Sequence, residues 1–131
     1  MITNEDLLKE ISQKELIELS DLNGTGELNQ EVINDAINDA ISFIESFFKF
    51  PKNPTNLLKQ IAIELSIYEL RKRNNLTSDK SKERLKELES YLIKMANNKI
   101  PKTLKSEQKE HKTNIIATAK KGKKIDFKGW Q

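Results

Sequence analysis

Apolar side chains recur at three- and four-residue spacing over three long stretches of this 131-residue chain, and that period is typical of α-helices. The clearest stretch begins at Asn29 and reaches Phe48. A second stretch, over residues 55–72, is apolar on more than one face, which predicts a central helix covered by neighbouring helices or by another subunit. The third is capped by Ser78 or Asp79 and keeps a narrow apolar stripe, so its other faces are expected to be exposed.

Two shorter helices are predicted ahead of these three. Thr3 can cap a first segment of about two turns, and Ser12 followed by Glu15 has the spacing of a capping box for a second segment that ends at Ser20. The sequence therefore predicts an all-α fold, a compact bundle of four to five helices with two short N-terminal helices and three longer ones. We expect this helical domain to span residues 1–98 and an extended C-terminal arm to span residues 99–131.

The composition excludes most enzyme chemistry. The chain has no cysteine, and its one histidine is His111, so disulfides, thiolate nucleophiles, cysteine zinc sites and paired imidazoles are all ruled out. We find no glycine motif that cradles phosphate and no nucleophile elbow. We therefore expect no enzymatic activity and no cofactor. No window approaches the roughly 18 uninterrupted apolar residues of a membrane span, so we also expect no membrane partner.

Charge is unevenly distributed along the chain. Residues 1–50 carry 11 Asp/Glu against 3 Lys/Arg, a net charge of −8, whereas residues 51–98 carry 10 Lys/Arg against 6 Asp/Glu. Residues 99–131 carry 10 Lys against 3 acidic residues, a net charge of +7. Such asymmetry is typical of head-to-tail self-association or of a basic arm that binds nucleic acid or an acidic partner. A solvated, lysine-rich tail is the simplest alternative.

The predicted arm interleaves cations with aromatic rings near its end. Its candidate contact residues are Lys120, Lys121, Lys123, Lys124, Phe127 and Trp130. These residues suit phosphates and a stacking contact, and they also suit an acidic protein surface whose pockets take the rings. Because residues 1–50 of a like subunit supply an acidic surface, we favour a protein partner. The alternative is a small nucleic-acid-binding protein that uses this arm and the Arg71–Arg73 cluster.

The loop after Asp21 has part of a calcium-loop pattern. Asp21, Asn23 and Thr25 fall at the first, third and fifth ligand positions, but Val32 stands where the bidentate acid should be. We therefore predict no metal and favour a polar turn in which Asn29 caps the next helix. The weak candidate ligands in this loop are Asp21, Asn23, Thr25 and Glu27.

The order of these segments resembles the Mu-like neck family of bacteriophages and prophages over residues 1–98. The resemblance rests on the segments Lys14–Asp21 (KELIELSD), Asn23–Gly26 (NGTG), Val32–Ala40 (VINDAINDA) and Ile61–Arg71 (IAIELSIYELR). It continues into a final helix between Lys82 and Pro101. The arm itself is not matched to the family residue by residue, so its expected role rests on its own residues.

Members of that family look like head–tail connector or head-completion proteins of helical fold. The resemblance implies a structural protein whose copies form a ring between portal and tail, in the virion or, during assembly, in the cytoplasm of the host bacterium. The implied partners are other copies of the chain, a portal or adaptor protein and a tail-completion protein, with DNA in the channel as a further candidate. The resemblance supplies no catalytic residues and no cofactor.

Overall fold

The computed structural model of the protein describes residues 2–104, which form helices joined by turns and loops. The five helices are α1 (Asn4–Leu7), α2 (Gln13–Ser20), α3 (Gln30–Glu45), α4 (Asn56–Arg73) and α5 (Asp79–Ala96). Over this range there is no strand, and a single isolated antiparallel bridge joins Pro54 to Thr103. The predicted all-α bundle, with two short helices followed by three longer ones, is confirmed.

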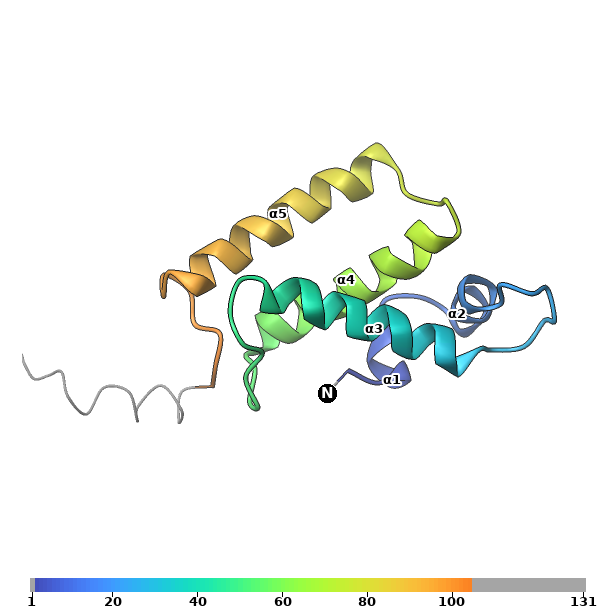
Figure 1. The fold of residues 1–131 in the computed structure, drawn as a ribbon, viewed down its shortest axis with the longest axis horizontal. Helices are drawn as coiled ribbons and strands as arrows, with labels where there is room; N and C mark the ends of the chain where they lie inside the picture. The colour runs from blue at the N-terminus through green and yellow to red at the C-terminus, as the bar shows by residue number, and fades with distance from the viewer. Residues whose placement is uncertain (1, 105–131) are drawn as a thin grey trace, which may run out of the picture.

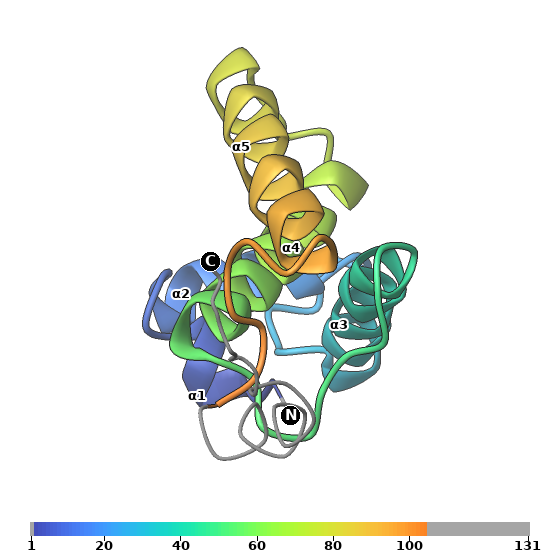
Figure 2. The ribbon, with the colours of Figure 1, turned by 90° about the vertical axis from the view of Figure 1, so that its left-hand side faces the viewer.

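Helix α4 lies at the centre of the bundle and contacts each of the other four helices. Its most extensive contact is with α3 (Figure 1), and the view turned by 90° shows α3 on one side of α4 and both α1 and α2 on the other (Figure 2). Helix α5 extends away from this layer of helices, as the turned view shows most clearly (Figure 2). None of the helices within residues 2–104 is long and apolar enough to cross a membrane.

The burial of α4 follows from its sequence, which has apolar residues on several faces. Two runs of three consecutive residues, 61–63 and 65–67, are buried, together with Leu58 and Leu70. Consecutive residues on a helix point in different directions, so α4 must be covered on most of its circumference. This confirms the prediction of a central helix and shows that helices of the same chain provide the cover.

The predicted helix starts are confirmed by their capping contacts. The side chains of Thr3, Ser12, Asn29 and Ser78 accept hydrogen bonds from backbone N–H groups of the first turns that follow them, as N-cap residues do. The first helix is shorter than predicted, with one turn instead of two. Its capping box is complete, because the Asp6 carboxylate also accepts a hydrogen bond from the Thr3 backbone N–H at 3.0 Å.

Two asparagines end helices α4 and α5, and in α5 the end comes earlier than Pro101, where the sequence pattern stops. Asn75 and Asn98 have φ angles of 58° and 60°, in the left-handed region that asparagine tolerates better than most residues. After α4, the Leu76 N–H donates to the Arg71 carbonyl at 2.8 Å, and after α5 the Lys99 N–H donates to the Lys94 carbonyl at the same distance. These are Schellman closures, and they stop α5 at Ala96, ahead of Pro101.

Residues 99–104 return to the helical domain and pair with the start of α4. The Thr55 N–H donates to the Lys102 carbonyl at 3.1 Å, and the Leu104 N–H donates to the Asn53 carbonyl at 2.9 Å. The Thr55 hydroxyl also donates to the Pro101 carbonyl at 3.3 Å. The first residues of the predicted arm are therefore attached to the junction between α3 and α4, and the rest of the arm lies outside the described residues.

Candidate functional site

The loop between α2 and α3 is closed by one carboxylate. Asp21 accepts hydrogen bonds from the backbone N–H of Gly26 at 2.6 Å and from the backbone N–H and hydroxyl of Thr25 at 2.8 and 3.0 Å. The Gly26 and Thr25 N–H groups lower the pKa of Asp21, since they stabilise its ionised form. Gly24 and Gly26 both have positive φ, which lets the chain reverse here. Leu22 sits on this loop with 51% of its surface exposed.

A second contact holds the two ends of the loop together. The hydroxyl of buried Ser20 accepts a hydrogen bond from the Asn29 N–H at 3.0 Å and donates to the Ile17 carbonyl at 3.2 Å. The weak candidate ligands Asp21 and Thr25 are thus hydrogen-bonded to each other. Asn23 and Glu27 are exposed residues of the same loop. Among residues 2–104 no three acidic or histidine side chains converge as a metal site would require.

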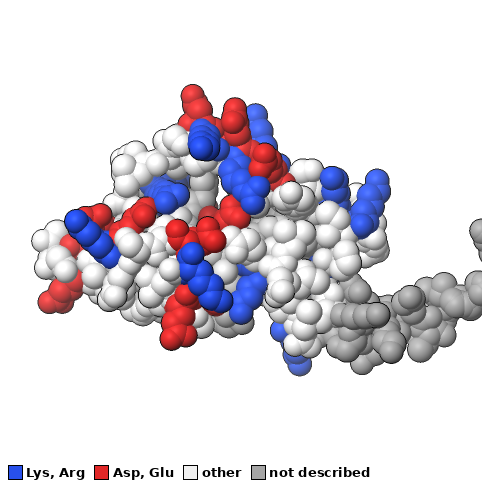
Figure 3. Space-filling view, turned by 180° about the vertical axis from the view of Figure 1, so that it is seen from behind, with Lys and Arg blue, Asp and Glu red and all other residues white. Residues whose placement is uncertain are grey.

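Two parts of the described chain differ in the sign of their own charges, although Arg71 and Arg73 of α4 contact the acidic part at Glu15 and at the Val32 carbonyl. We define the acidic end as residues 15–35, which carry six Asp/Glu and no Lys/Arg, and the lysine end as residues 46–56 and 94–104, which carry five Lys and no Asp/Glu. In Figure 1 the α2–α3 loop of the acidic end is at the far right, and both segments of the lysine end are at the left. Seen from behind, the part of the surface nearest the grey segment shows blue side chains and no red ones (Figure 3).

The lysine end also gathers apolar side chains that the core leaves partly exposed. Phe47, Phe48 and Phe50 pack against the core without being buried in it, and the Lys102 ammonium lies 5.5 Å from the centre of the Phe48 ring, within range of a cation–π contact. A hollow of about 260 Å³ opens beside them. Its side-chain lining includes Ile2, Phe50, Lys52, Pro54, Lys59 and Leu104.

The Arg71–Arg73 cluster is engaged within the subunit. Arg71 donates to the Glu15 carboxylate at 2.8 Å, and the Arg73 guanidinium pairs with Asp39. Lys72 lies 3.4 Å from a carboxylate of its own helix, that of Glu69. Because each cation already has an acidic partner, this cluster does not favour the phosphate contacts of the nucleic-acid interpretation.

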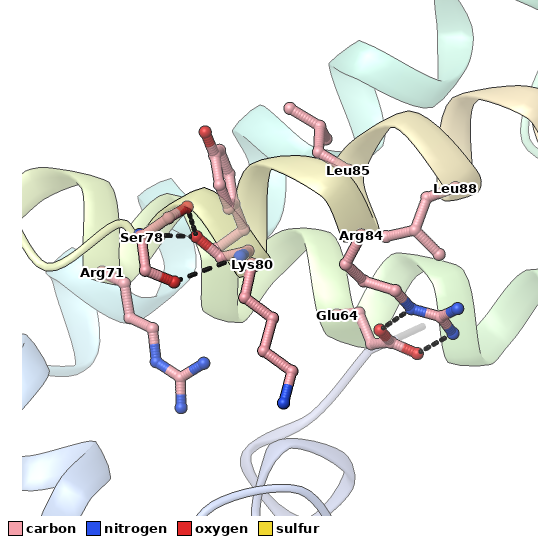
Figure 4. A pocket seen from close by; sticks show the side chains of 9 residues that line it. Glu64, Arg71, Ser78, Lys80, Arg84, Leu85 and Leu88 are labelled. Atoms are coloured by element: carbon pink, nitrogen blue, oxygen red, sulfur yellow. Dashed lines mark hydrogen bonds and ion pairs between the residues drawn. The ribbon is translucent and has the colours of Figure 1, made fainter.

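A second hollow, of about 260 Å³, lies between α4 and the first half of α5. Tyr68, Leu85 and Leu88 contribute apolar side chains to its lining, and the Arg84 guanidinium, which also lines it, binds the Glu64 carboxylate at 2.9 and 3.1 Å (Figure 4). This pairing lowers the pKa of Glu64 and raises that of Arg84. The two charges satisfy each other, so the hollow has the features of a structural contact between helices.

The candidate contact residues of the arm, Lys120, Lys121, Lys123, Lys124, Phe127 and Trp130, lie outside the described residues, as does His111. The structure instead brings forward the lysine end, which the sequence analysis did not single out. Two signals for it were available: four of the five phenylalanines fall within residues 43–50, and residues 46–56 have no acidic side chain. That the second segment, residues 94–104, joins them could not be read from local patterns.

The described residues thus define a small all-α domain built around one central helix, with an acidic segment toward one end and two lysine-bearing segments toward the other. The chain belongs to the Bacteriophage Mu, Gp36 family, whose model matches residues 2–119. It is therefore a Mu-like phage protein, as the resemblance predicted. No curated protein and no solved structure matches it.

Proposed function

We propose that this chain is a structural head–tail connector of the phage particle, a head-completion or neck protein whose copies form a ring between the portal and the tail. The observation that carries the proposal is the separation of charge between the two ends of the domain. Membership of the Bacteriophage Mu, Gp36 family supports the phage setting.

Two different, complementary ends are what a ring subunit needs. A contact between unlike patches repeats from copy to copy, and it closes into a ring when the rotation between neighbours allows closure. The acidic end and the lysine end can form such a pair, since the first has six Asp/Glu in its own segment and only Arg71 and Arg73 of α4 as the cations bonded to it, while the segments of the second carry five Lys and no Asp/Glu. Attraction between them favours the head-to-tail arrangement and disfavours pairing of like ends.

The proposed role is non-enzymatic. Its partners are neighbouring copies, a portal or adaptor protein on the head side and a tail-completion protein on the tail side, and its place is the virion. No cofactor enters this role. The Lys-rich residues 105–131, with eight Lys and three acidic residues, have a composition suited to contact with the neighbouring proteins or with DNA in the channel.

Deleting the gene from the phage or prophage that encodes the chain tests the proposal directly. Induced cultures should then accumulate DNA-filled heads and free tails, and joined particles should return when the intact chain is supplied from a plasmid. Electron microscopy of the lysates counts the three kinds of particle. Normal joining of heads and tails without the chain would overturn the proposal.

Measuring the affinity for duplex DNA at several salt concentrations distinguishes the connector proposal from the nucleic-acid-binding alternative. Phosphate contacts make affinity fall steeply as salt rises, so tight, strongly salt-dependent binding by a chain that stays monomeric would favour that alternative. A connector should instead gain mass with concentration in the absence of DNA, as light scattering would record.

A further inference from the structure

We propose that the hollow of the lysine end receives the α2–α3 loop of a second copy of this chain, with Leu22 as the side chain that enters it. The inference rests on the proposed connector function and names the contact between neighbouring copies.

The hollow has the chemistry of a receptor for an apolar side chain on an acidic segment. Ile2, Phe50 and Leu104 give the hollow apolar walls, and the cationic residues Lys52 and Lys59 also line it. Lys59 lies 3.8 Å from the Asp6 carboxylate and so has a partner. Lys52 is exposed, and no acidic residue lines the hollow. The occupant that fits is therefore an apolar residue next to negative charge.

The α2–α3 loop presents that combination. Leu22 is 51% exposed at the edge of a loop that contains Glu27 and lies between Glu18 and Glu31. From residue 15 to residue 48 the chain has no lysine or arginine, and Arg71 and Arg73, which contact this stretch, are already paired with Glu15 and Asp39. The Asp21 contacts to Thr25 and Gly26 fix the shape of the loop before any partner binds, which reduces the ordering cost of association.

The positions of the two features suit a contact between copies. The α2–α3 loop lies at one end of the long axis of the domain, and residues 50, 52–54 and 104, which line the hollow, lie toward the other end (Figure 1). A loop at one end that enters a hollow at the other end produces a head-to-tail contact, which can repeat around a ring. A contact of one leucine and a few lysines is small, so association of the free protein should be weak and should weaken further as salt screens the charges.

Engineered cysteines in the full-length chain test the contact, because the chain has no cysteine of its own. A Leu22→Cys copy is mixed with a size-tagged Leu104→Cys copy under mild oxidation. We expect a disulfide-linked dimer of the two kinds of copy. The matched control replaces the second copy with Leu76→Cys, since Leu76 is an exposed leucine outside the lysine end, with 60% of its surface accessible. The control pair should cross-link at least about tenfold more slowly, the difference that about 1.4 kcal/mol makes.

A charge exchange in the cysteine-free chain tests the same contact without cross-links. Glu27→Lys and Lys52→Glu should each weaken self-association about tenfold at low salt, and the chain that carries both substitutions should regain it. Glu83→Lys, on the exposed side of α5, changes the charge by the same amount and should leave association unchanged. Sedimentation velocity across concentrations measures all four variants.

The outcomes separate this contact from the connector function. If each single charge substitution leaves self-association unchanged, and cross-linking stays at the control level, the contact is overturned and the connector proposal still stands. An internal disulfide in a monomeric Lys52→Cys/Trp130→Cys chain, formed in place of the cross-link between copies, would assign the hollow to the end of the same chain and overturn the contact. Normal head–tail joining without the gene would overturn the connector function independently.

Discussion

Helices α4 and α5 have the same length, 18 residues each, yet they stand in opposite relations to the rest of the molecule. Helix α4 buries eight residues, and α5 buries three, Leu88, Leu92 and Met95. All three lie in the second half of α5. Its first half, residues 79–87, has no buried residue, and the half-buried Leu85 in that half lines the hollow between α5 and α4. One helix is the core of the fold, and the other is buried only over its second half, while the Arg84–Glu64 ion pair joins its first half to α4.

This difference shows how a small domain can present surface without losing stability. The free energy of burial is concentrated in α4 and its neighbours, so α5 can use most of its circumference for charged side chains. Ile93, on the same helix, is 50% exposed, and single exposed apolar residues of this kind are normal on protein surfaces.

Ile61→Ala should lower the unfolding free energy the most, because it removes apolar volume from a fully buried position of α4. Cavity formation at such a site costs about 2–5 kcal/mol of unfolding free energy. Urea denaturation followed by circular dichroism measures it. A loss below about 1 kcal/mol would contradict the central role of α4.

Removing the N-caps of α4 and α5 should have the next largest effects on stability, and the two losses should differ. Thr55→Ala removes the cap of α4 and also the hydrogen bond from the Thr55 hydroxyl to Pro101, so it should cost about 1–2 kcal/mol. Ser78→Ala removes only local contacts at α5 and should cost about 1 kcal/mol. Equal losses in parallel denaturation curves would show that the Thr55 contact to residues 99–104 adds nothing.

Leu85→Ala should act locally on the first half of α5. The side chain is half-buried, so about 1 kcal/mol of unfolding free energy is expected. Amide hydrogen exchange should show faster exchange over residues 79–87 with α4 unchanged, since local opening reports weakly packed elements. Uniform acceleration across both helices would mean that α5 unfolds only together with the core.

Glu64→Gln should give the smallest effect, below about 1 kcal/mol, because the ion pair between α4 and α5 is partly exposed and screened. The pH dependence of this stability loss identifies the ion pair as its cause. The pKa of Glu64 is lowered in the folded state, so its contribution is present above the unfolded pKa of about 4.3 and is lost as pH falls through the lowered folded value. The stability curves of wild type and variant should therefore converge in acid, and a constant gap would exclude the ion pair as its cause.

The sequence predicted the helices and caps well because those features depend on local chemistry. Asn29 was predicted as a cap from the sequence, Ser78 was one of two candidates with Asp79, and the apolar faces of residues 55–72 already indicated a buried helix. The early end of α5 at the Asn97–Asn98 pair was missed, since proline is a stronger signal than a left-handed asparagine. The lysine end was missed for a different reason: hydrogen bonds between residues 53–55 and 101–104 assemble it, and no local pattern announces such long-range contacts.

Those same hydrogen bonds determine how the domain bears mechanical load. They close the chain between Asn53 and Leu104 into a loop that contains α4 and α5. Tension applied through the residues after Leu104 is therefore transmitted first to the backbone at Asn53 and Thr55, at the base of the central helix. Helix α5, lying inside the closed loop, is shielded from that tension until the Leu104 and Lys102 bonds break.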